Sequence, residues 1–358
     1  MVSMHNMRKK IPKVTVLMPV YNGEHYLREA IHSILNQTFQ DFEFIIINDG
    51  STDSSKQILE SFQDARIRIF HNKTNLKSSS SLNKGLKHAK GEYIARMDAD
   101  DICSPTRLEE QVKFLDDHPE IGIVGTDIEF INDSGECICD YRAPILPTSP
   151  ALIRWTLFFR CCINHPSVMV RKPVYASLGG YITSFNYAED YDLWLRASKK
   201  TQIANLRRKS LKLRKHSDNA TVKYREKHIR EAVLVAHKAI SDLLETEVPL
   251  NTVQKLRDRN LISSETDLAS VINLLYRLYQ LYSKTTELSF SERFYLKTNA
   301  FSMIGKMCLT YGKKQTKNIP IVIKTILSIH PMLIYQVPFC MFFNYLQNLI
   351  LKTLRVVL

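Results

Sequence analysis

The stretch VTVLMPVYNGEHYLREAIHSILNQTFQDFEFIIINDGSTD, residues 14–53, contains two apolar runs separated by a helical pattern. Val14–Val20 and Phe42–Ile47 are continuous and rich in β-branched residues, which is typical of strands buried on both faces. Between these runs, apolar residues recur at helical spacing from Leu27 to Leu35. A strand, a helix and a second strand with short connections predict parallel strands joined by a helical crossover.

The same alternation continues to the first acidic cluster of the chain. Helices are expected at Asp53–Phe62 and Leu82–Ala89, and strands at Ile67–Phe70 and Tyr93–Met97. We therefore predict an α/β fold with a doubly wound, mainly parallel sheet and helices on both faces. Ligands bind such sheets at the carboxyl ends of the strands. Three polar loops follow predicted strands and converge on that edge: 19–23, 48–51 and 98–101.

The composition of the chain changes near residue 205. Arg207–Arg230 holds ten Lys or Arg and two acidic residues, so it supplies +8 of the formal net charge of +13. We therefore expect an α/β domain at 1–205 and an α-helical C-terminal region at 206–358. Beyond the basic segment, three stretches have helical spacing: Arg230–Leu244, Ser264–Tyr282 and Ser291–Tyr311.

The last twenty residues, Phe339–Leu358, place their apolar side chains on one helical stripe, with Lys352 and Arg355 off it. This pattern predicts an amphipathic helix with a cationic end. Together with the basic segment 207–230, it favours a peripheral position at an anionic membrane surface. The alternative is that the stripe packs against the helices of 264–311 as in an ordinary bundle. Prolines and amides in this part of the chain disfavour a helix that spans the membrane.

The cysteines and the N-terminus bear on the compartment. The seven cysteines are irregularly spaced, and neither Cys137-x-Cys139 nor Cys161-Cys162 has the second half of a zinc pattern. We therefore expect reduced thiols. The first ten residues are basic but precede no apolar segment long enough for a signal peptide. Both features favour a cytoplasmic protein.

Three carboxylates, Asp98, Asp100 and Asp101, follow the strand expected at Tyr93–Met97. Like charges this close destabilise one another unless a positive charge lies between them. Asp98-Ala99-Asp100 is a D-x-D pattern, and hard cations such as Mg²⁺ or Mn²⁺ take oxygen ligands and leave room for phosphates. The pattern therefore predicts a metal that bridges the protein and a nucleotide diphosphate. The alternative is a solvated acidic turn before the next helix.

With these features in place, the chain resembles the family 2 glycosyltransferases of the GT-A fold. The resemblance covers the part of the chain before residue 205, in the family's order and spacing. Five stretches carry it: residues 14–53, GEYIARMDADD (91–101), RLEEQVKFL (107–115), NHPSVMVR (164–171) and GGY with AEDYDLWLR (179–196). It implies a nucleoside-diphosphate sugar donor, a Mn²⁺ or Mg²⁺ ion and an inverting transfer to a hydroxyl acceptor.

The resemblance assigns roles on the donor side. It implies that Asp49, in NDGSTD, binds the base of the nucleotide through the N3–H of a uracil. It also implies that Pro19, Tyr21 and Glu24 line the nucleoside pocket.

For the diphosphate, the resemblance implies that Asp98 holds the ribose or the metal and that Asp100 holds the metal, with Asp101 sharing this task. His216, in LRKHSDNAT, is similar to the family's R-x-H element, which approaches the diphosphate or the metal.

The cation that contacts the phosphates is left open. Many relatives have Ala-Arg-Asn before the third helix, whereas this chain has Ser81-Leu82-Asn83-Lys84. The candidates are therefore Lys84, Arg96 or neither.

An inverting transfer also needs a carboxylate that takes the proton of the acceptor hydroxyl. The resemblance places it in AEDYDLW, which implies that Asp190 is the base and that Glu189 orients the acceptor or shifts the proton affinity of Asp190. Acidic residues also suit a helix N-terminus, and we assign Asp192 to that structural role. His165 lies where relatives often carry a histidine near the acceptor, although a buried, hydrogen-bonded histidine explains it equally well.

Two other functions compete with this one. A nucleotidyltransferase acting on a sugar phosphate also uses metal-binding acids, but it normally has a glycine-rich basic loop after the first strand, where this chain has Pro19–Gly23. The net charge of +13 also suits a non-catalytic nucleic-acid-binding protein, although Tyr224 is the one aromatic residue within 207–230.

We therefore expect no nucleic-acid partner. The expected acceptor is a glycan or a lipid-linked acceptor, and the expected place is the inner face of the cell membrane. The setting that the resemblance implies is the synthesis of a bacterial envelope polysaccharide.

Overall fold

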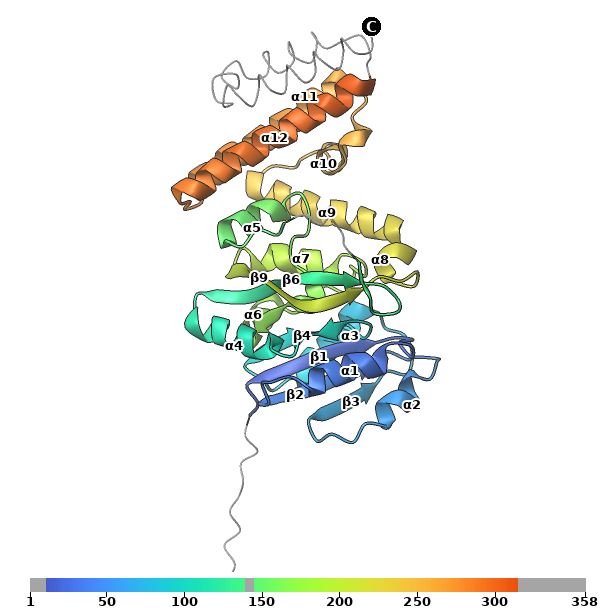
Figure 1. Cartoon of the computed structure of the whole chain (residues 1–358). Coiled ribbons are helices and arrows are strands. Elements are labelled where there is room, and N and C mark those ends of the chain that lie inside the picture. The colour runs from blue at the N-terminus through green and yellow to red at the C-terminus, as the bar shows by residue number, and fades with distance from the viewer. Residues whose placement is uncertain (1–10, 139–144, 315–358) are drawn as a thin grey trace, which may run out of the picture. The chain divides into compact units, whose positions relative to one another are not determined.

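The computed structural model describes residues 11–138 and 145–314 (Figure 1). The chain divides into two compact units, Met1–Val235 and Ala236–Leu358. The amphipathic stripe predicted for 339–358 lies outside the described residues.

The first half of the first unit is the predicted doubly wound sheet. Its four strands are parallel and lie in the order β3-β2-β1-β4, in the lower part of Figure 1. They are β1 (Val14–Val20), β2 (Phe42–Asn48), β3 (Ile67–His71) and β4 (Tyr93–Arg96). Three helices connect them: α1 (Leu27–Leu35), α2 (Ser55–Glu60) and α3 (Ser78–His88).

Burial explains why these segments adopt this structure. All seven residues of β2 are buried, as expected for a strand covered on both faces. On α1, the apolar residues at helical spacing, from Leu27 to Ile34, are fully buried and face the same core as β1. The polar residues that follow β1, β2 and β4 consequently meet at the carboxyl edge of the sheet.

The second half of the unit makes the sheet mixed. β8 (Met169–Arg171) runs antiparallel to β4 and to β6 (Ile121–Ile131), and β9 (Gln202–Arg214) runs parallel to β6. β5 (Ile102–Cys103) pairs with β9, and β7 (Cys137–Ile138) pairs with β6. The other elements are α4 (Arg107–Asp117), α5 (Pro150–Leu157), the 3₁₀ turn η1 (His165–Ser167), α6 (Lys172–Leu178) and α7 (Glu189–Ala197).

Residues 206–214 differ from the expectation that the helical region starts at 206. They form the second half of β9, and Leu211 and Arg214 are buried. The many Lys and Arg residues of this stretch do not resemble the apolar pattern of a buried strand. In the structure most of these cations lie on the exposed side of β9, where Arg208 pairs with Glu110 and Lys209 with Glu129. The expected boundary at 205 therefore lies inside a strand of the sheet.

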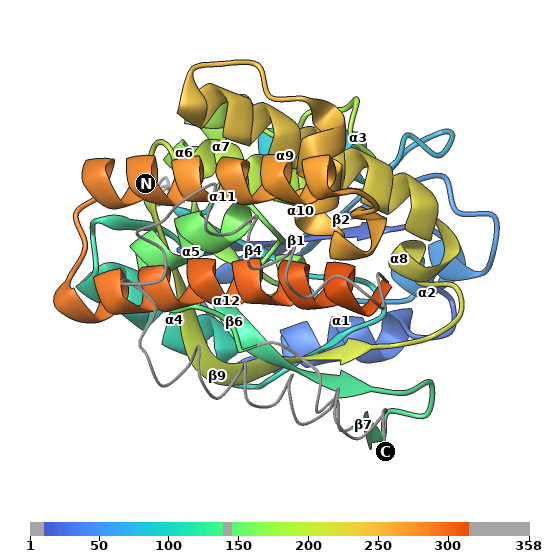
Figure 2. The ribbon, with the colours of Figure 1, turned by 90° about the horizontal axis from the view of Figure 1, so that it is seen from above.

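Helices dominate the chain after β9. They are α8 (Ala220–Lys223), α9 (Arg225–Leu244), α10 (Leu250–Arg257), the 3₁₀ turn η2 (Arg259–Leu261), α11 (Glu265–Thr285) and α12 (Phe290–Lys314). α9, α11 and α12 confirm the three helices predicted from spacing. In the second unit, α11 and α12 lie side by side (Figure 2), and the buried face of α11 runs from Leu268 to Tyr282. No helix in the described ranges is long and apolar enough to cross a membrane.

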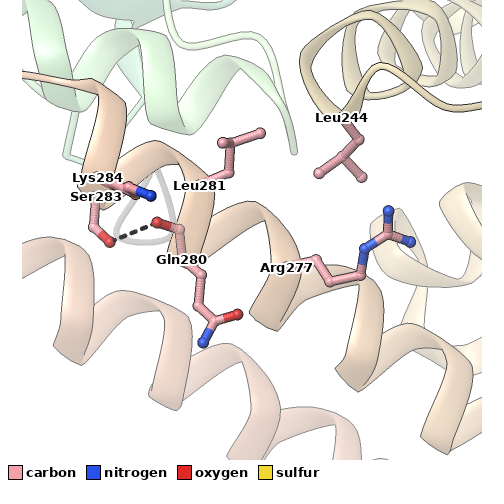
Figure 3. A pocket seen from close by; sticks show the side chains of 6 residues that line it. All are labelled: Leu244, Arg277, Gln280, Leu281, Ser283 and Lys284. Carbon is pink, nitrogen blue, oxygen red and sulfur yellow. Dashed lines mark hydrogen bonds between the residues drawn. The ribbon is translucent and has the colours of Figure 1, made fainter.

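The second unit has an open hollow of about 610 Å³ beside α11. Its lining residues are Leu244, Arg277, Gln280, Leu281, Ser283 and Lys284 (Figure 3). Because Arg277, Gln280 and Lys284 are exposed, the hollow offers no buried polar group to a ligand.

Candidate active site

Asp49 follows β2 and is 3% exposed. Its Oδ1 accepts hydrogen bonds from the side-chain amide of Asn72 (2.7 Å) and from the backbone N–H of Leu76 (2.9 Å). The ammonium group of Lys84 donates to Oδ1 of Asn72 (2.6 Å). Lys84 therefore supports the residue that holds Asp49, and its own described bonds do not reach the acids after β4.

A glycine is required directly after Asp49. Gly50 has φ +70°, and a Cβ there would lie 2.6 Å from the carbonyl carbon of Thr74. This close approach brings the chain that follows β3 against the loop after β2. The contact explains how Leu76 reaches Asp49.

The loop after β1 carries the other predicted nucleoside-pocket residues. Tyr21 is 50% exposed and Pro19 is half-buried. Oε2 of Glu24 accepts a hydrogen bond from the backbone N–H of Ser54 (2.9 Å), and the backbone N–H of Glu24 donates to Asp53 (3.0 Å). Glu24 thus ties the first two loops of the edge together, whereas Tyr21 presents a free aromatic face.

Asp98, Asp100 and Asp101 form a compact oxygen cluster after β4. Each offers one carboxylate oxygen, and these oxygens lie within 4.8 Å of one another. Asp101 is 2% exposed, and its Oδ2 has no hydrogen-bond partner, which is costly for a buried oxygen. Burial, followed by repulsion from Asp100, raises the pKa of Asp101 well above its usual range. A converging set of oxygens with one unsatisfied buried atom fits a hard divalent cation.

Two cations lie against this cluster from the sheet itself. Arg96, on β4, forms an ion pair with Asp98 and is 5% exposed. Arg214, at the end of β9, donates its backbone N–H to Oδ1 of Asp101 (3.0 Å) and its Nε to the carbonyl of Asp100 (3.0 Å). The guanidinium of Arg96 is therefore a positive charge beside the crowded carboxylates, whereas that of Arg214 pairs with Glu29 and holds the loop through backbone carbonyls.

His216 and Asn219 complete the surroundings of Asp100. The Nε2 of His216 lies 3.0 Å from Oδ2 of Asp100, and the amide of Asn219 donates to the same oxygen (3.2 Å). The hydrogen bond with Asp100 raises the pKa of His216. The R-x-H element thus lies at the acid cluster. The sequence analysis named His216 from that element but overlooked Arg214, its first residue.

Glu189 and Asp190 begin α7. Glu189 is buried, and burial, followed by repulsion from Asp190, raises its pKa to about 8. Burial also raises the pKa of Asp190, against the effect of a hydrogen bond from the backbone N–H of Tyr191 (2.7 Å). Because one acid hinders ionisation of the other, the pair keeps a proton on Glu189 at neutral pH. Ser78, on α3, forms a hydrogen bond with Glu189.

Two neighbouring residues, Asp192 and His165, are buried and bonded to other side chains of the fold. Asp192 is buried and forms an ion pair with Arg196, one helical turn later, at 2.7 Å. His165 is buried, and its Nε2 lies 2.8 Å from the hydroxyl of Tyr181. Burial lowers the pKa of His165 well below its usual range, so the imidazole is neutral. This environment supports the alternative of a buried, hydrogen-bonded histidine.

The first unit therefore brings together most of the predicted residues. Asp49 lies after β2, and the three aspartates lie after β4 beside His216. Glu189 and Asp190 are close enough to Arg96 for its charge to lower the pKa of both, although burial has the larger, opposite effect. The sequence analysis missed Asn72, Arg214 and Asn219. Their hydrogen bonds join residues far apart in the chain, so no local pattern marks them.

Comparisons with known proteins give a consistent result. Residues 15–175 match the family "Glycosyl transferase family 2". An uncharacterized glycosyltransferase of Haemophilus influenzae is 33% identical over 295 residues, which are 78% of this chain and 90% of that protein. The O-antigen biosynthesis glycosyltransferase WbnJ of Escherichia coli is 38% identical over 186 residues, or 51% of this chain and 70% of WbnJ. Two further relatives align with 52% of this chain and with 66% and 64% of their own lengths.

A solved structure shares the fold. The crystal structure of S. aureus TarS 1–349 in complex with UDP-GlcNAc matches 86% of this chain and 93% of that chain, with a TM-score of 0.58 and 17% sequence identity. This likeness confirms the predicted GT-A fold, a mainly parallel α/β sheet followed by a helical region.

Proposed function

The chain belongs to glycosyl transferase family 2, and from this premise we propose that it moves a sugar from a nucleoside-diphosphate sugar to a hydroxyl acceptor with inversion. The observation that carries the proposal is the convergence, at one sheet edge, of Asp49 with the cluster Asp98, Asp100 and Asp101. Membership in a glycosyltransferase family decides against the nucleotidyltransferase alternative.

On the donor side, we assign the base to Asp49 and the nucleoside to the loop that carries Pro19, Tyr21 and Glu24. The bonds from Asn72 and Leu76 occupy Oδ1 of Asp49, so they fix the orientation of its carboxylate, which supports this assignment. A carboxylate that accepts the N3–H of a uracil favours a UDP-linked donor. The complex of TarS with UDP-GlcNAc supports a donor of this class.

We assign Asp98, Asp100 and Asp101 to a Mn²⁺ or Mg²⁺ ion, with His216 beside them. When bound, the ion neutralises charge on the diphosphate that leaves. The chain's own contribution is to hold the carboxylates close together: the positive charge of Arg96 offsets their repulsion, and the backbone N–H of Arg214 fixes Asp101. The ion pair with Asp98 joins Arg96 to the cluster, and we propose that its Nε, buried without a hydrogen-bond partner, donates to the diphosphate.

On the acceptor side, Asp190 takes the proton of the attacking hydroxyl. Glu189, which keeps its proton at neutral pH, leaves the negative charge of the pair on Asp190. Asp190 is half-buried and Glu189 is buried, so we assign the acceptor's proton to Asp190.

The proposed acceptor class is based on the biosynthetic role named for a relative and not on residues of this chain that would contact the acceptor. We propose a glycan or lipid-linked acceptor in envelope polysaccharide synthesis, supported by the similarity to WbnJ, whose name refers to O-antigen biosynthesis. A peripheral position at the inner face of the membrane would suit such an acceptor. Exposed cations after β9, such as Lys223 and Arg230, are available to anionic lipid.

A screen of nucleotide-sugars tests the proposal. The melting temperature is measured with UDP-, GDP- and dTDP-sugars, each with and without Mn²⁺, since a ligand stabilises the folded state by mass action. A Mn²⁺-dependent increase with a UDP-sugar is expected, followed by release of free UDP when acceptor is added. Stabilisation by no nucleotide-sugar, or release of pyrophosphate, would contradict the proposal.

A further inference from the structure

One carboxylate near the site belongs to neither acid group. Oε2 of Glu231, on α9, accepts hydrogen bonds from three consecutive backbone N–H groups: Asn186 (3.0 Å), Tyr187 (2.8 Å) and Ala188 (3.1 Å). These residues immediately precede Glu189, the first residue of α7. Glu231 lies in the part of α9 that belongs to the same unit as α7.

No side chain at the N-cap of α7 accepts hydrogen bonds from the backbone N–H groups at this end of the helix. Ala188 is the N-cap of α7 and has no side chain that can accept a hydrogen bond. Three convergent N–H groups form a strong site for a negative charge, and the helix N-terminus adds to it. Glu231 therefore supplies, from a helix more than forty residues later, the anion that the segment lacks.

Aromatic and cationic contacts from the same region hold the segment on another side. The rings of Tyr187 and Tyr224 are 5.0 Å apart, and Nζ of Lys227 lies 5.6 Å from the ring centre of Tyr187. From α3, the hydroxyl of Ser79 donates to the carbonyl of Phe185 (2.8 Å). The segment is thus clamped between α3 and α9.

We propose that Glu231 is a positioning residue for the reaction: by fixing the backbone of 186–188, it sets the place of Glu189 and Asp190. The inference rests on the proposed function, because it concerns the residues assigned to proton transfer. Glu231 acts on the backbone through its charge and does not touch substrate.

The test uses Glu231→Gln in the full chain, which keeps the size of the side chain and removes its charge. Peptides that contain residues 186–188 should exchange amide hydrogen about 10-fold or more faster, since hydrogen bonds to a charged group are the stronger ones. The kcat for sugar transfer should fall about 10-fold to 100-fold, while the KM for the donor and the binding of UDP stay within about twofold.

The matched control is Glu226→Gln, the same change on an exposed glutamate in the first turn of α9. It should alter neither exchange at 186–188 nor kcat. A second variant, Glu231→Asp, keeps the charge but withdraws it by one methylene, and it should also speed exchange. If Glu231→Gln unfolds the protein, the Asp variant provides the same measurement.

The outcomes separate this inference from the proposed function. Unchanged exchange at 186–188 in both Glu231 variants would overturn the anchoring. Faster exchange with an unchanged kcat would overturn the positioning role. If Asp190→Asn leaves transfer intact, the base assignment fails, whereas the exchange result still decides whether Glu231 anchors the segment.

Discussion

The two acid groups of the site are held in different ways. Among the strand-end acids, Asp98 forms an ion pair with Arg96, and Asp100 bonds to His216, whose pKa it raises. Glu189 and Asp190 form no ion pair with a cationic side chain among the residues that the structure describes, and burial raises the pKa of both.

This difference shows how one residue type serves two chemical tasks. Acids that bind a metal do so in the ionised form, and here Arg96 favours that form against the burial that raises the pKa of Asp98 and Asp101. A pair that must accept one proton needs an ionised acid beside a neutral one, and burial of two adjacent carboxylates produces that state. The environments, more than the residue types, therefore separate the two roles.

The largest expected effect is the loss of one strand-end acid. Asp100→Ala should leave no measurable transfer and should remove the Mn²⁺-dependent part of the increase in melting temperature caused by UDP, because Asp100 contributes one of the converging carboxylate oxygens. Asp117→Ala, an exposed aspartate at the end of α4, is the control and should behave like the parent. If the Asp100 variant still shows the full Mn²⁺-dependent shift in melting temperature, the assignment of the metal to these aspartates is wrong.

The next effect concerns the base. Asp190→Asn keeps the shape of the side chain and removes its ability to take a proton, so kcat should fall by about 10²–10⁴-fold. Donor binding should survive, which distinguishes this variant from Asp100→Ala. The measurement is kcat together with the shift in melting temperature on adding UDP and Mn²⁺. Near-normal turnover would move the proton-accepting role to another residue.

A smaller effect should appear in stability as a function of pH. Between the ordinary pKa of a glutamate, 4.5, and about 8, the folded protein keeps a proton on Glu189 that the unfolded chain has lost. Folding stability from this group therefore falls as pH rises through that range. Glu189→Gln removes this dependence. The difference in the free energy of unfolding between variant and parent should therefore shift in favour of the variant, by on the order of a few kcal/mol, from pH 5 to pH 8. Urea unfolding at both pH values measures it, and parallel curves would show that the pKa of Glu189 is not raised.

The smallest effect is expected at Asp192. Asp192→Asn still accepts a hydrogen bond from Arg196, so the free energy of unfolding should fall by about 1 kcal/mol or less. Turnover should stay within about threefold of the parent, since we assign this residue to structure. A loss of kcat comparable to that of Asp190→Asn would place Asp192 in the catalytic pair.

The sequence by itself determined the sheet and the candidate chemistry. Buried strands such as Val14–Val20 have a continuous apolar pattern, and the helices between them have a clear helical period, so their order can be predicted without a structure. The D-x-D pattern at Asp98 and the acids before α7 are contiguous stretches of sequence, and recognising the family depends on such stretches.

Only the tertiary structure decided what surrounds these acids. Arg214 reaches the carbonyl of Asp100 across 114 positions, and Glu231 reaches the backbone of Asn186 across 45. The same holds for β9, whose cations concealed a strand that pairs with β6 along its length. A local stretch of sequence shows its hydrophobic period and its charge density. The partners of a buried charge, however, come from distant parts of the chain that only the tertiary fold brings together. The protonation states of the two acid groups follow from those partners, because the pKa of each carboxylate depends on its burial and on the charges beside it.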